Sequence, residues 1–266
     1  MAGALPILMY HHVSPAPGLV TVSPENFHRQ MAALARGGYR TAGLEAVADL
    51  LAGRPLPPKT VVLTFDDGYF DNWHHAYPIL KEFGFRAVVF LITGWLGDGP
   101  VRTAGETPSH RECMARVQGA CPSDVMLRWS EVEAMAADGT VEFHSHTHTH
   151  TRWDRQVSDP GIRRERLAED LHASRTALAR QLGNASPHLC WPQGYHDSDY
   201  RDVARQQGFS YLYTVTRGSC LPTSDPLQIP RIVVKDRGGL WLTTRLGIYR
   251  QPWLARVYAA ARRDGT

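Results

Sequence analysis

The sequence predicts a single α/β domain built on a parallel β-sheet, and three observations carry this prediction. Strand-length runs of apolar and β-branched residues, such as 60–65, alternate with helical patterns through most of the chain. These runs are apolar throughout, as expected for parallel strands that are buried on both faces. With 266 residues, 43% of them hydrophobic, the chain can bury a large core and has the length of one α/β barrel. We therefore expect a sheet that is closed or nearly closed into a barrel.

The elements follow in order along the chain. An apolar run predicts a first strand over 5–10. Ser23 then opens a helix as its N-cap, with Pro24 at the first helical position, and Gly37-Gly38 ends it. Glycine, proline and polar residues without periodicity fill 94–126, which predicts a long excursion over one end of the fold. The remaining predicted elements are helix 44–52, strand 60–65, helix 72–83, strand 86–92, helix 129–137, strand 140–143, helix 161–182, strand 188–191, helix 198–207, strand 210–215 and strand 230–234.

The segment 239–266 differs from the rest of the predicted domain, 1–238, in its interleaved aromatic residues, aliphatic residues and arginines. This composition is typical of a segment that contacts a membrane surface or a partner. A C-terminal helix packed over the barrel with exposed arginines also explains it, and both interpretations stay open. Nothing in the chain approaches the ~18 apolar residues of a membrane span. The N-terminus lacks a charged region before its apolar run, so we expect a cytoplasmic protein.

Composition excludes some classes of function. The formal net charge is +3, and no long basic run stands out, which argues against a nucleic-acid-binding protein. The four cysteines show no C-x-x-C spacing. Cys113 and Cys121 alone could pair within one loop, but free thiols are the expectation in a chain of this size.

Two adjacent carboxylates, Asp66 and Asp67, end the central predicted strand, and Gly68 opens the turn that follows. A simple polar turn would explain this chemistry. However, α/β enzymes usually hold their catalytic groups where parallel strands end. The pair is therefore a candidate site.

A histidine run near the middle of the chain offers partners for these carboxylates. In an extended chain, His144, His146, His148 and His150 would lie on one side. If the chain becomes helical after Ser145, His146 and His150 form an i, i+4 pair able to reach one metal ion. Two imidazoles with one carboxylate are a frequent ligand set for a catalytic divalent metal.

Three motifs in this order resemble those of the polysaccharide deacetylases, the NodB-homology or family 4 carbohydrate esterases. They are Thr-Phe-Asp-Asp-Gly at 64–68, Ser-His-Thr-His-Thr-His at 145–150, and Trp-Pro-Gln-Gly at 191–194. The resemblance spans roughly 5–235. It implies a single distorted (β/α)7-type barrel and a hydrolase of linear amide C–N bonds.

The resemblance also implies residue roles. Asp67, His146 and His150 would bind one divalent metal, with zinc expected and cobalt, nickel or iron as alternatives. Asp66 would be the general base, which takes a proton from the water that the metal activates. The backbone N–H of Gln193 would steady the oxyanion. Trp191 and Trp129 are the further candidates for substrate contact.

Two departures from the family pattern affect these roles. The motif arginine that orients the base falls at Cys190, so that role is vacant or supplied elsewhere. The usual Leu-x-His that supplies the general acid is also missing. The segment 8–12 instead resembles the Tyr-His motif of the poly-N-acetylglucosamine deacetylase subgroup. We therefore assign His11 as the acid, with His12 as its substitute; a histidine in a polar loop is the plain alternative.

The sequence thus predicts a metal-dependent hydrolase that removes N-acetyl groups from GlcNAc-type amino sugars in a glycan or glycolipid. A lipid-linked saccharide at the inner face of the membrane is the favoured substrate, with 239–266 in peripheral membrane contact. Alternatives are a deformylase or O-acetyl esterase acting on a lipid-linked sugar, and a catalytically inactive glycan-binding homologue. Metal storage by the histidine run is a weaker alternative, because storage would not need the Asp-Asp pair.

Overall fold

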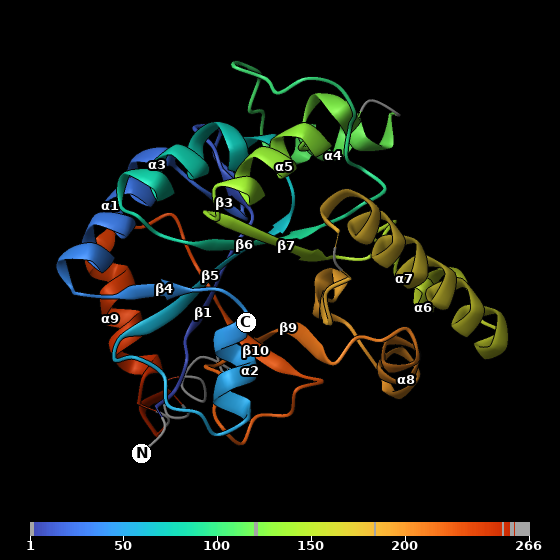
Figure 1. Ribbon diagram of the computed structural model, residues 1–266. Helices are drawn as coiled ribbons and strands as arrows, with labels where there is room; N and C mark the ends of the chain where they lie inside the picture. The colour runs from blue at the N-terminus through green and yellow to red at the C-terminus, as the bar shows by residue number, and fades with distance from the viewer. Residues whose placement is uncertain (1–2, 120–121, 184, 252, 256–257, 259–266) are drawn as a thin grey trace.

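Parallel strands form a closed ring in the computed structural model, which describes residues 3–119, 122–183, 185–251, 253–255 and 258 (Figure 1). The ring closes because β1 pairs with β10 on one side and with β5 on the other. A further strand, β4 (Arg40–Ala42), pairs with the first residues of β5. In order, the ring consists of β1 (Ile7–Tyr10), β10 (Ile229–Val233), β9 (Tyr211–Arg217), β8 (His188–Cys190), β7 (Val141–Ser145), β6 (Ala87–Leu91) and β5 (Thr60–Asp67). The predicted α/β fold with a parallel sheet is confirmed.

Helices surround the ring, and their ends carry the signals that the sequence shows. Ser23 caps α1 by accepting a hydrogen bond from the Asn26 N–H, and Asp159 caps α7 in the same way. The helices are α1 (Pro24–Arg36), α2 (Glu45–Leu51), α3 (Tyr77–Glu82), α4 (His110–Gln118), α5 (Trp129–Ala137), α6 (Trp153–Gln156), α7 (Pro160–Leu182), α8 (Ser198–Gln206) and α9 (Gly239–Tyr249).

Alternation along β5 decides which side chains face the interior of the ring. Val62 packs with residues such as Phe90 of β6, in a cluster closed by apolar side chains of α2. Its neighbours Leu63 and Phe65 pack outward against the helices. Since successive side chains of a strand alternate, the interior face continues through Thr64 to Asp66. The strand thus delivers one carboxylate directly into the mouth of the ring.

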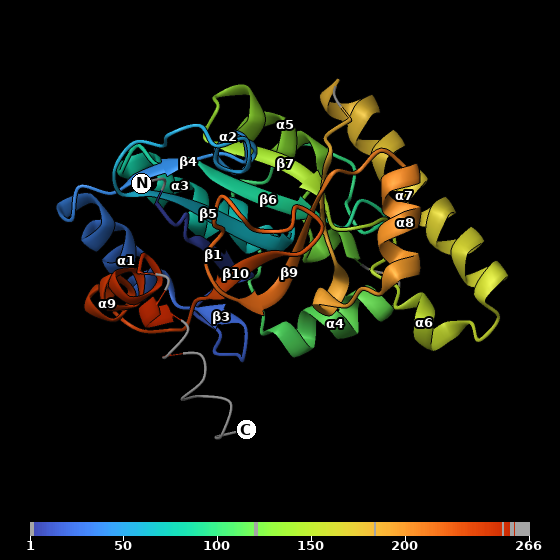
Figure 2. The ribbon, with the colours of Figure 1, turned by 90° about the horizontal axis from the view of Figure 1, so that it is seen from below.

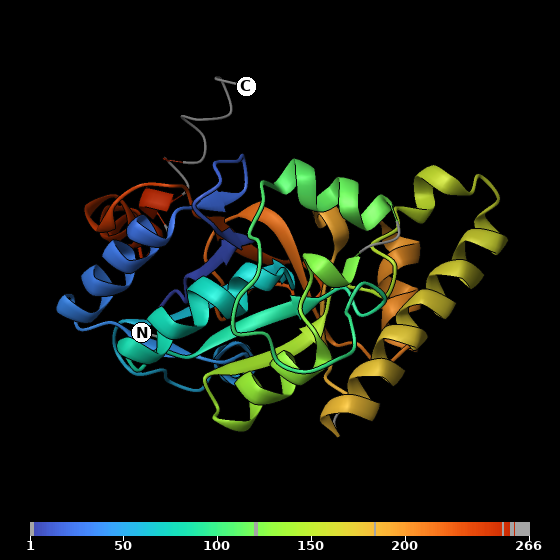
Figure 3. The ribbon, with the colours of Figure 1, turned by 90° about the horizontal axis from the view of Figure 1, so that it is seen from above.

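The excursion over 94–126 contains more structure than its lack of periodicity predicts. Ser109 and Glu112 form a capping box that starts α4, a signal visible in the sequence as S-x-x-E. The helix buries only Cys113, so it has almost no apolar stripe. Figures 2 and 3 show that α4 lies over the same end of the ring as the short strand β3 (Thr21–Val22), which pairs with β2 (His12–Val13).

Arg102 fastens this excursion to the barrel. Its guanidinium donates to both carboxylate oxygens of Glu131 at 2.7 Å and to the carbonyls of Ser123 and Met126. It also lies 3.9 Å from the ring centroid of Phe70. Because the Glu131 side chain is fully buried, this ion pair is shielded from solvent. The loop is therefore held firmly against the end of the ring.

The predicted helix 72–83 is divided. Its first part, Asn72–Ala76, is π-helical and its second part is α3. Pro78 lies at the change, where its missing N–H cannot donate to residue 74.

The C-terminal segment begins as a helix packed on the barrel. Leu242 and Leu246 of α9 are buried, and α9 approaches α1 so closely at Gly239 that a Cβ there would lie 2.4 Å from the Cβ of Ala33. Leu240 and Trp253 are exposed. The packed-helix interpretation therefore describes 239–249, while 252, 256–257 and 259–266 lie outside the described residues.

Two further expectations can be compared with the described residues. None of the helices found there is both long enough and apolar enough to cross a membrane. Cys113, Cys190 and Cys220 are buried free thiols. Cys121, the other member of the candidate pair, lies outside the described residues.

Candidate active site

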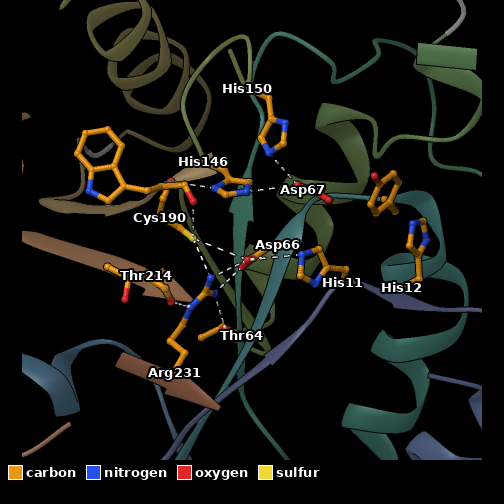
Figure 4. A network of polar contacts seen from close by, with 12 residues as sticks. His11, His12, Thr64, Asp66, Asp67, His146, His150, Cys190, Thr214 and Arg231 are labelled. Carbon is orange, nitrogen blue, oxygen red and sulfur yellow. Dashed lines mark hydrogen bonds and ion pairs between the residues drawn. The ribbon is translucent and has the colours of Figure 1, made fainter. Parts of the chain in front are cut away.

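At the end of β5, the carboxylates of Asp66 and Asp67 point into different surroundings. Asp66 keeps the strand direction, whereas Asp67 has a φ of 76° and Gly68 one of 85°. A side chain at Gly68 would be strained by this left-handed conformation, and its Cβ would also displace the Leu91 Cδ2, which would lie 2.6 Å away. This tight turn swings the Asp67 carboxylate away from Asp66 and toward the histidine loop (Figure 4).

Asp66 is held by a fully buried arginine from β10. Arg231 donates from Nη1 to Oδ1 at 2.6 Å and from Nη2 to Oδ2 at 2.7 Å. Its Nε donates to the Thr214 carbonyl at 3.0 Å, and its Nη2 lies 3.0 Å from the Cys190 Sγ. Burial raises the pKa of Asp66, but the guanidinium outweighs it and leaves that pKa below its ordinary value. The orienting arginine is therefore supplied from elsewhere in the chain, which is one of the two possibilities that the sequence left open.

Asp67 faces two imidazoles. Its Oδ1 lies 3.3 Å from His146 Nε2 and 3.7 Å from His150 Nε2. Burial raises the pKa of Asp67, but the contact with His146 brings it well below the ordinary value, so the carboxylate is ionised. These are the three residues predicted to bind metal.

The chain from Ser145 to His150 is neither an extended strand nor a helix. Thr147 and His150 have φ values of 68° and 61°. The carboxylate of Asp170, on α7, accepts from the N–H groups of His148 and Thr149 at 2.8 and 2.9 Å. Both conformations weighed for this segment are thus wrong, because a buried carboxylate from a distant helix folds it into a compact loop.

The four histidines of the run consequently have different partners. His144 points to Ser186, and His148 Nδ1 lies 2.9 Å from the Thr93 hydroxyl. Only His146 and His150 reach the carboxylate of Asp67.

The donor set of Asp67, His146 and His150 fits a divalent metal. One donor atom from each residue lies within 4.8 Å of the others. His146 Nδ1 contacts the Cys190 carbonyl at 2.8 Å, so Nε2, which faces Asp67, is the ring nitrogen that could bind a metal. Burial lowers the pKa of His150 to about 4, so its imidazole is neutral near pH 7 and can offer a lone pair.

A second group, Asp66, His146 and Cys190, meets the same distance limit. It is a poorer metal site, because Arg231 already binds Asp66 and burial raises the pKa of the Cys190 thiol.

The two N-terminal histidines face opposite ways. His11 lines the pocket above the carboxylates, with its Nε2 3.8 Å from Asp66 Oδ2. Burial lowers the pKa of His11, and the nearby Asp66 and Asp67 carboxylates only partly offset this. His12 is fully buried, with its Nδ1 2.5 Å from Asp71 Oδ2. Of the two candidates for the acid, His11 is the one that lines the pocket.

A pocket of about 230 Å³ lies over these groups. Trp191 and Gln193 line it, and Gln193 sits in a turn with a φ of 55°. Trp129 does not; it is 7% exposed and packs in the main hydrophobic core. The excursion supplies Trp95 in its place, with its ring centroid 5.4 Å from that of His150.

Sequence reasoning missed Arg231, which binds Asp66, and several residues that line the pocket. Arg231 lies within an otherwise apolar predicted strand. A charged residue at such a position is rarely buried without a partner, and this was the available signal. The others missed are Val20, Tyr69, Trp95, His110, Met114 and Val215.

The chain belongs to the polysaccharide deacetylase family, because the family profile "Polysaccharide deacetylase" matches residues 53–212. This family is metal-dependent, in agreement with the donor set above. A poly-beta-1,6-N-acetyl-D-glucosamine N-deacetylase of Staphylococcus aureus is 24% identical over 182 residues, which cover 68% of this chain and 56% of that protein. The chain spans from one third to just over one half of the length of the first curated relatives that it matches.

Solved structures share the fold over nearly the whole chain. IcaB from Ammonifex degensii is 26% identical with a TM-score of 0.71, and the match covers 88% of this chain and 93% of that one. A Streptococcus pyogenes deacetylase, PplD in complex with acetate, is 22% identical with a TM-score of 0.75, and the match covers 95% and 100%.

Proposed function

We propose that this chain is a metal-dependent N-deacetylase of GlcNAc-type amino sugars in a glycan or glycolipid. The proposal rests on the different surroundings of two adjacent carboxylates. Asp66 is bound by an arginine, whereas Asp67 faces two histidines. The name of the staphylococcal relative supports the substrate class. Such a division suits one base and one metal ligand.

Asp67, His146 and His150 would hold the cation, and their nitrogen and carboxylate donors favour zinc. When bound there, a divalent cation would lower the pKa of water and polarise the acetyl carbonyl. The neutral imidazole of His150 and the ionised carboxylate of Asp67 are ready for this role without first losing protons.

Asp66 would act as the general base. Arg231 keeps it ionised and fixes the plane of its carboxylate, so it can accept a proton in one orientation. His11 would donate a proton to the departing sugar amine. Its lowered pKa makes the imidazolium a stronger acid, although a smaller fraction of it is protonated at neutral pH.

The backbone N–H of Gln193 would donate to the oxyanion that forms from the acetyl carbonyl. The turn that carries this residue adjoins the pocket wall formed by Trp191. Trp191 is buried and its indole Nε1 has no hydrogen-bond partner among the described residues. Trp191 thus offers an apolar wall to an N-acetyl sugar, whereas its Nε1 is itself buried.

Acetate release from GlcNAc oligomers by metal-loaded protein tests the proposal. Matched N-formyl and O-acetyl substrates separate deacetylation from the deformylase and O-acetyl esterase alternatives. The Asp66→Asn variant should bind metal and lose turnover. If the wild-type protein binds these oligomers but releases no acetate, formate or O-acetyl group, the inactive glycan-binding alternative replaces ours.

We propose, further, that the substrate is lipid-linked and that a cationic groove beside the pocket meets an anionic membrane surface. The groove, of about 700 Å³, is lined by Lys235, Trp241 and Arg245 among others. None of its cations has an acidic partner within ion-pair distance in the described part of the chain. An adjoining hollow includes Arg217, which lies two residues along β9 from Val215 of the active-site pocket.

Sedimentation with vesicles of anionic or neutral phospholipid tests this proposal. Truncation at 240 would remove the buried Leu242 and Leu246, so charge reversal is the sharper change. Lys235→Glu combined with Arg245→Glu should abolish binding to anionic vesicles, whereas Arg54→Glu, at an exposed helix end, should not. Unchanged sedimentation of the double variant would remove the membrane proposal. The compartment stays a prediction that cell fractionation can test.

A further inference from the structure

A second carboxylate–imidazole chain leads into the pocket beside the proposed catalytic groups. The buried His12 contacts Asp71 through Nδ1 at 2.5 Å and His110 through Nε2 at 3.2 Å. Asp71 also accepts from the Val13 N–H at 3.1 Å. Tyr69 stacks on the His12 ring with centroids 3.7 Å apart. None of these side chains has a task in the chemistry proposed above.

This chain of contacts ends on His110, which lines the active-site pocket. His110 is the first residue of α4 and lies within the capping box that Ser109 and Glu112 form. Its Nδ1 faces His12 at 3.2 Å and the Tyr69 hydroxyl at 3.3 Å. These two contacts use one ring nitrogen and leave Nε2 with no hydrogen-bond partner among the described residues.

The imidazole of His110 is therefore positioned before any ligand arrives. One edge of the ring is held by a buried pair that is 0% and 3% exposed at His12 and Asp71. Burial, together with the neighbouring His12, lowers the pKa of His110 and favours its neutral form. A neutral imidazole nitrogen can pair with a hydroxyl group as donor or as acceptor, depending on the tautomer. Sugar hydroxyls accept either arrangement.

We propose that His110 Nε2 binds a ring hydroxyl of the sugar whose N-acetyl group faces Asp66 and Asp67, and that His12 and Asp71 position it. This inference rests on the proposed N-deacetylase function. It makes the excursion that carries α4 a part of the substrate site. A binding site built to pair with a hydroxyl discriminates against a sugar that lacks it, because the imidazole then loses its partner.

The test measures binding of a GlcNAc oligomer to metal-loaded Asp66→Asn protein, with deoxy-sugar analogues as probes. His110→Ala should weaken binding of the parent sugar about tenfold, the equivalent of one net hydrogen bond. The same substitution should have little effect on the analogue that lacks the partner hydroxyl. His75→Ala is the matched control, because His75 contacts Thr107 and does not line the pocket. Equal losses for every deoxy analogue would overturn the assignment.

Steady-state kinetics of variants that keep Asp66 test the two positioning residues. His12→Phe should raise KM about as much as His110→Ala and leave kcat nearly unchanged, while His12→Gln should restore part of the loss. The double variant His12→Phe/His110→Ala should be no worse than His110→Ala, since both changes remove one interaction. Additive losses, or a fall confined to kcat, would contradict a positioning role. Failure of the wild-type protein to release acetate would instead remove the proposed function, while the binding measurement would still decide on His110.

Discussion

Arg231 holds Asp66 through two parallel hydrogen bonds inside the ring of strands, with both side chains withdrawn from solvent. The two residues are 165 positions apart and come from strands that are not adjacent in the ring. They meet because both point into its interior. A bidentate guanidinium fixes the plane of the carboxylate as well as its charge. The arrangement sets Asp66 apart from Asp67, which has no contact with arginine among those the described residues show.

Substitution of Arg231 by lysine distinguishes the effect of its positive charge on Asp66 from the effect of its bidentate geometry. Arg231→Lys keeps a cation near Asp66 but loses the bidentate pair and the bond to the Thr214 carbonyl. We expect kcat to fall about 10- to 100-fold, the usual cost of losing an outer partner of a catalytic group, with metal content unchanged. Acetate release and metal analysis on the same sample measure both effects.

Arg231→Met should also destabilise the fold, because it leaves the Asp66 carboxylate buried and unpaired. Loss of one partner of a buried ion pair typically costs about 3–5 kcal/mol in the free energy of unfolding. Arg175→Met serves as the control, since Arg175 bonds two backbone carbonyls far from the site. Full activity in both Arg231 variants would show that Asp66 needs no orienting partner.

The sequence predicted the strands of the ring and most helices, because each rests on a local pattern, and the family motifs added the candidate metal ligands; β2, β3 and β4 were not predicted. Asp66 and Asp67 follow one buried run, and His146 and His150 lie within six positions of Ser145. The role of Arg231 could not be derived in this way, since it contacts Asp66 only because the closed ring brings β10 and β5 together. His110 was hidden for a different reason: its short helix has one buried residue and no apolar stripe.

The conformation of the histidine loop was also beyond local reasoning. The repeated His-Thr pattern is compatible with a strand or a helix, whereas the observed loop depends on Asp170, some twenty residues later in α7. Three groups of the loop donate hydrogen bonds to this one carboxylate, and these tertiary contacts override either local preference.

Removal of a metal ligand should lower the metal content, whereas removal of the base should leave it unchanged. Asp67→Ala and His146→Ala should each lower the bound metal substantially and abolish most acetate release. Chelation of the wild-type protein should do the same, and added zinc should restore activity. By contrast, Asp66→Asn should retain metal and lose turnover. Elemental analysis distinguishes the classes; stoichiometric metal in the Asp67→Ala protein would contradict the ligand assignment.

Asp170 should control metal affinity without contacting the metal. Its carboxylate accepts from the His148 and Thr149 N–H groups, and its second oxygen accepts from the Trp153 indole at 3.0 Å. Asp170→Asn puts a donor where acceptors are needed, so the loop that carries His146 and His150 should loosen. We expect metal affinity to fall about 10- to 100-fold. Competition with a chromogenic chelator measures this, and Glu169→Gln, on the exposed side of α7, is the matched control.

The buried His188 should make the protein sensitive to acid. Burial lowers its pKa to about 2, and the neighbouring His144 acts in the same direction. Its Nδ1 lies 2.9 Å from the hydroxyl of Tyr213. The unfolded chain would protonate this imidazole near its ordinary pKa of 6.5, so between pH 6.5 and about 2 the unfolded state binds one proton more. Stability from this residue is therefore present above pH 6.5 and is lost as the pH falls.

The size of the effect follows from one proton. Below pH 6.5, the free energy of unfolding should fall by up to about 1.4 kcal/mol per pH unit more in wild-type protein than in His188→Gln. Urea unfolding between pH 7 and pH 4, at constant metal content, gives the two slopes. His172→Gln, on the exposed face of α7, should keep the wild-type slope. Parallel slopes for wild-type and His188→Gln protein would mean that His188 gains its proton in the folded state as readily as in the unfolded chain.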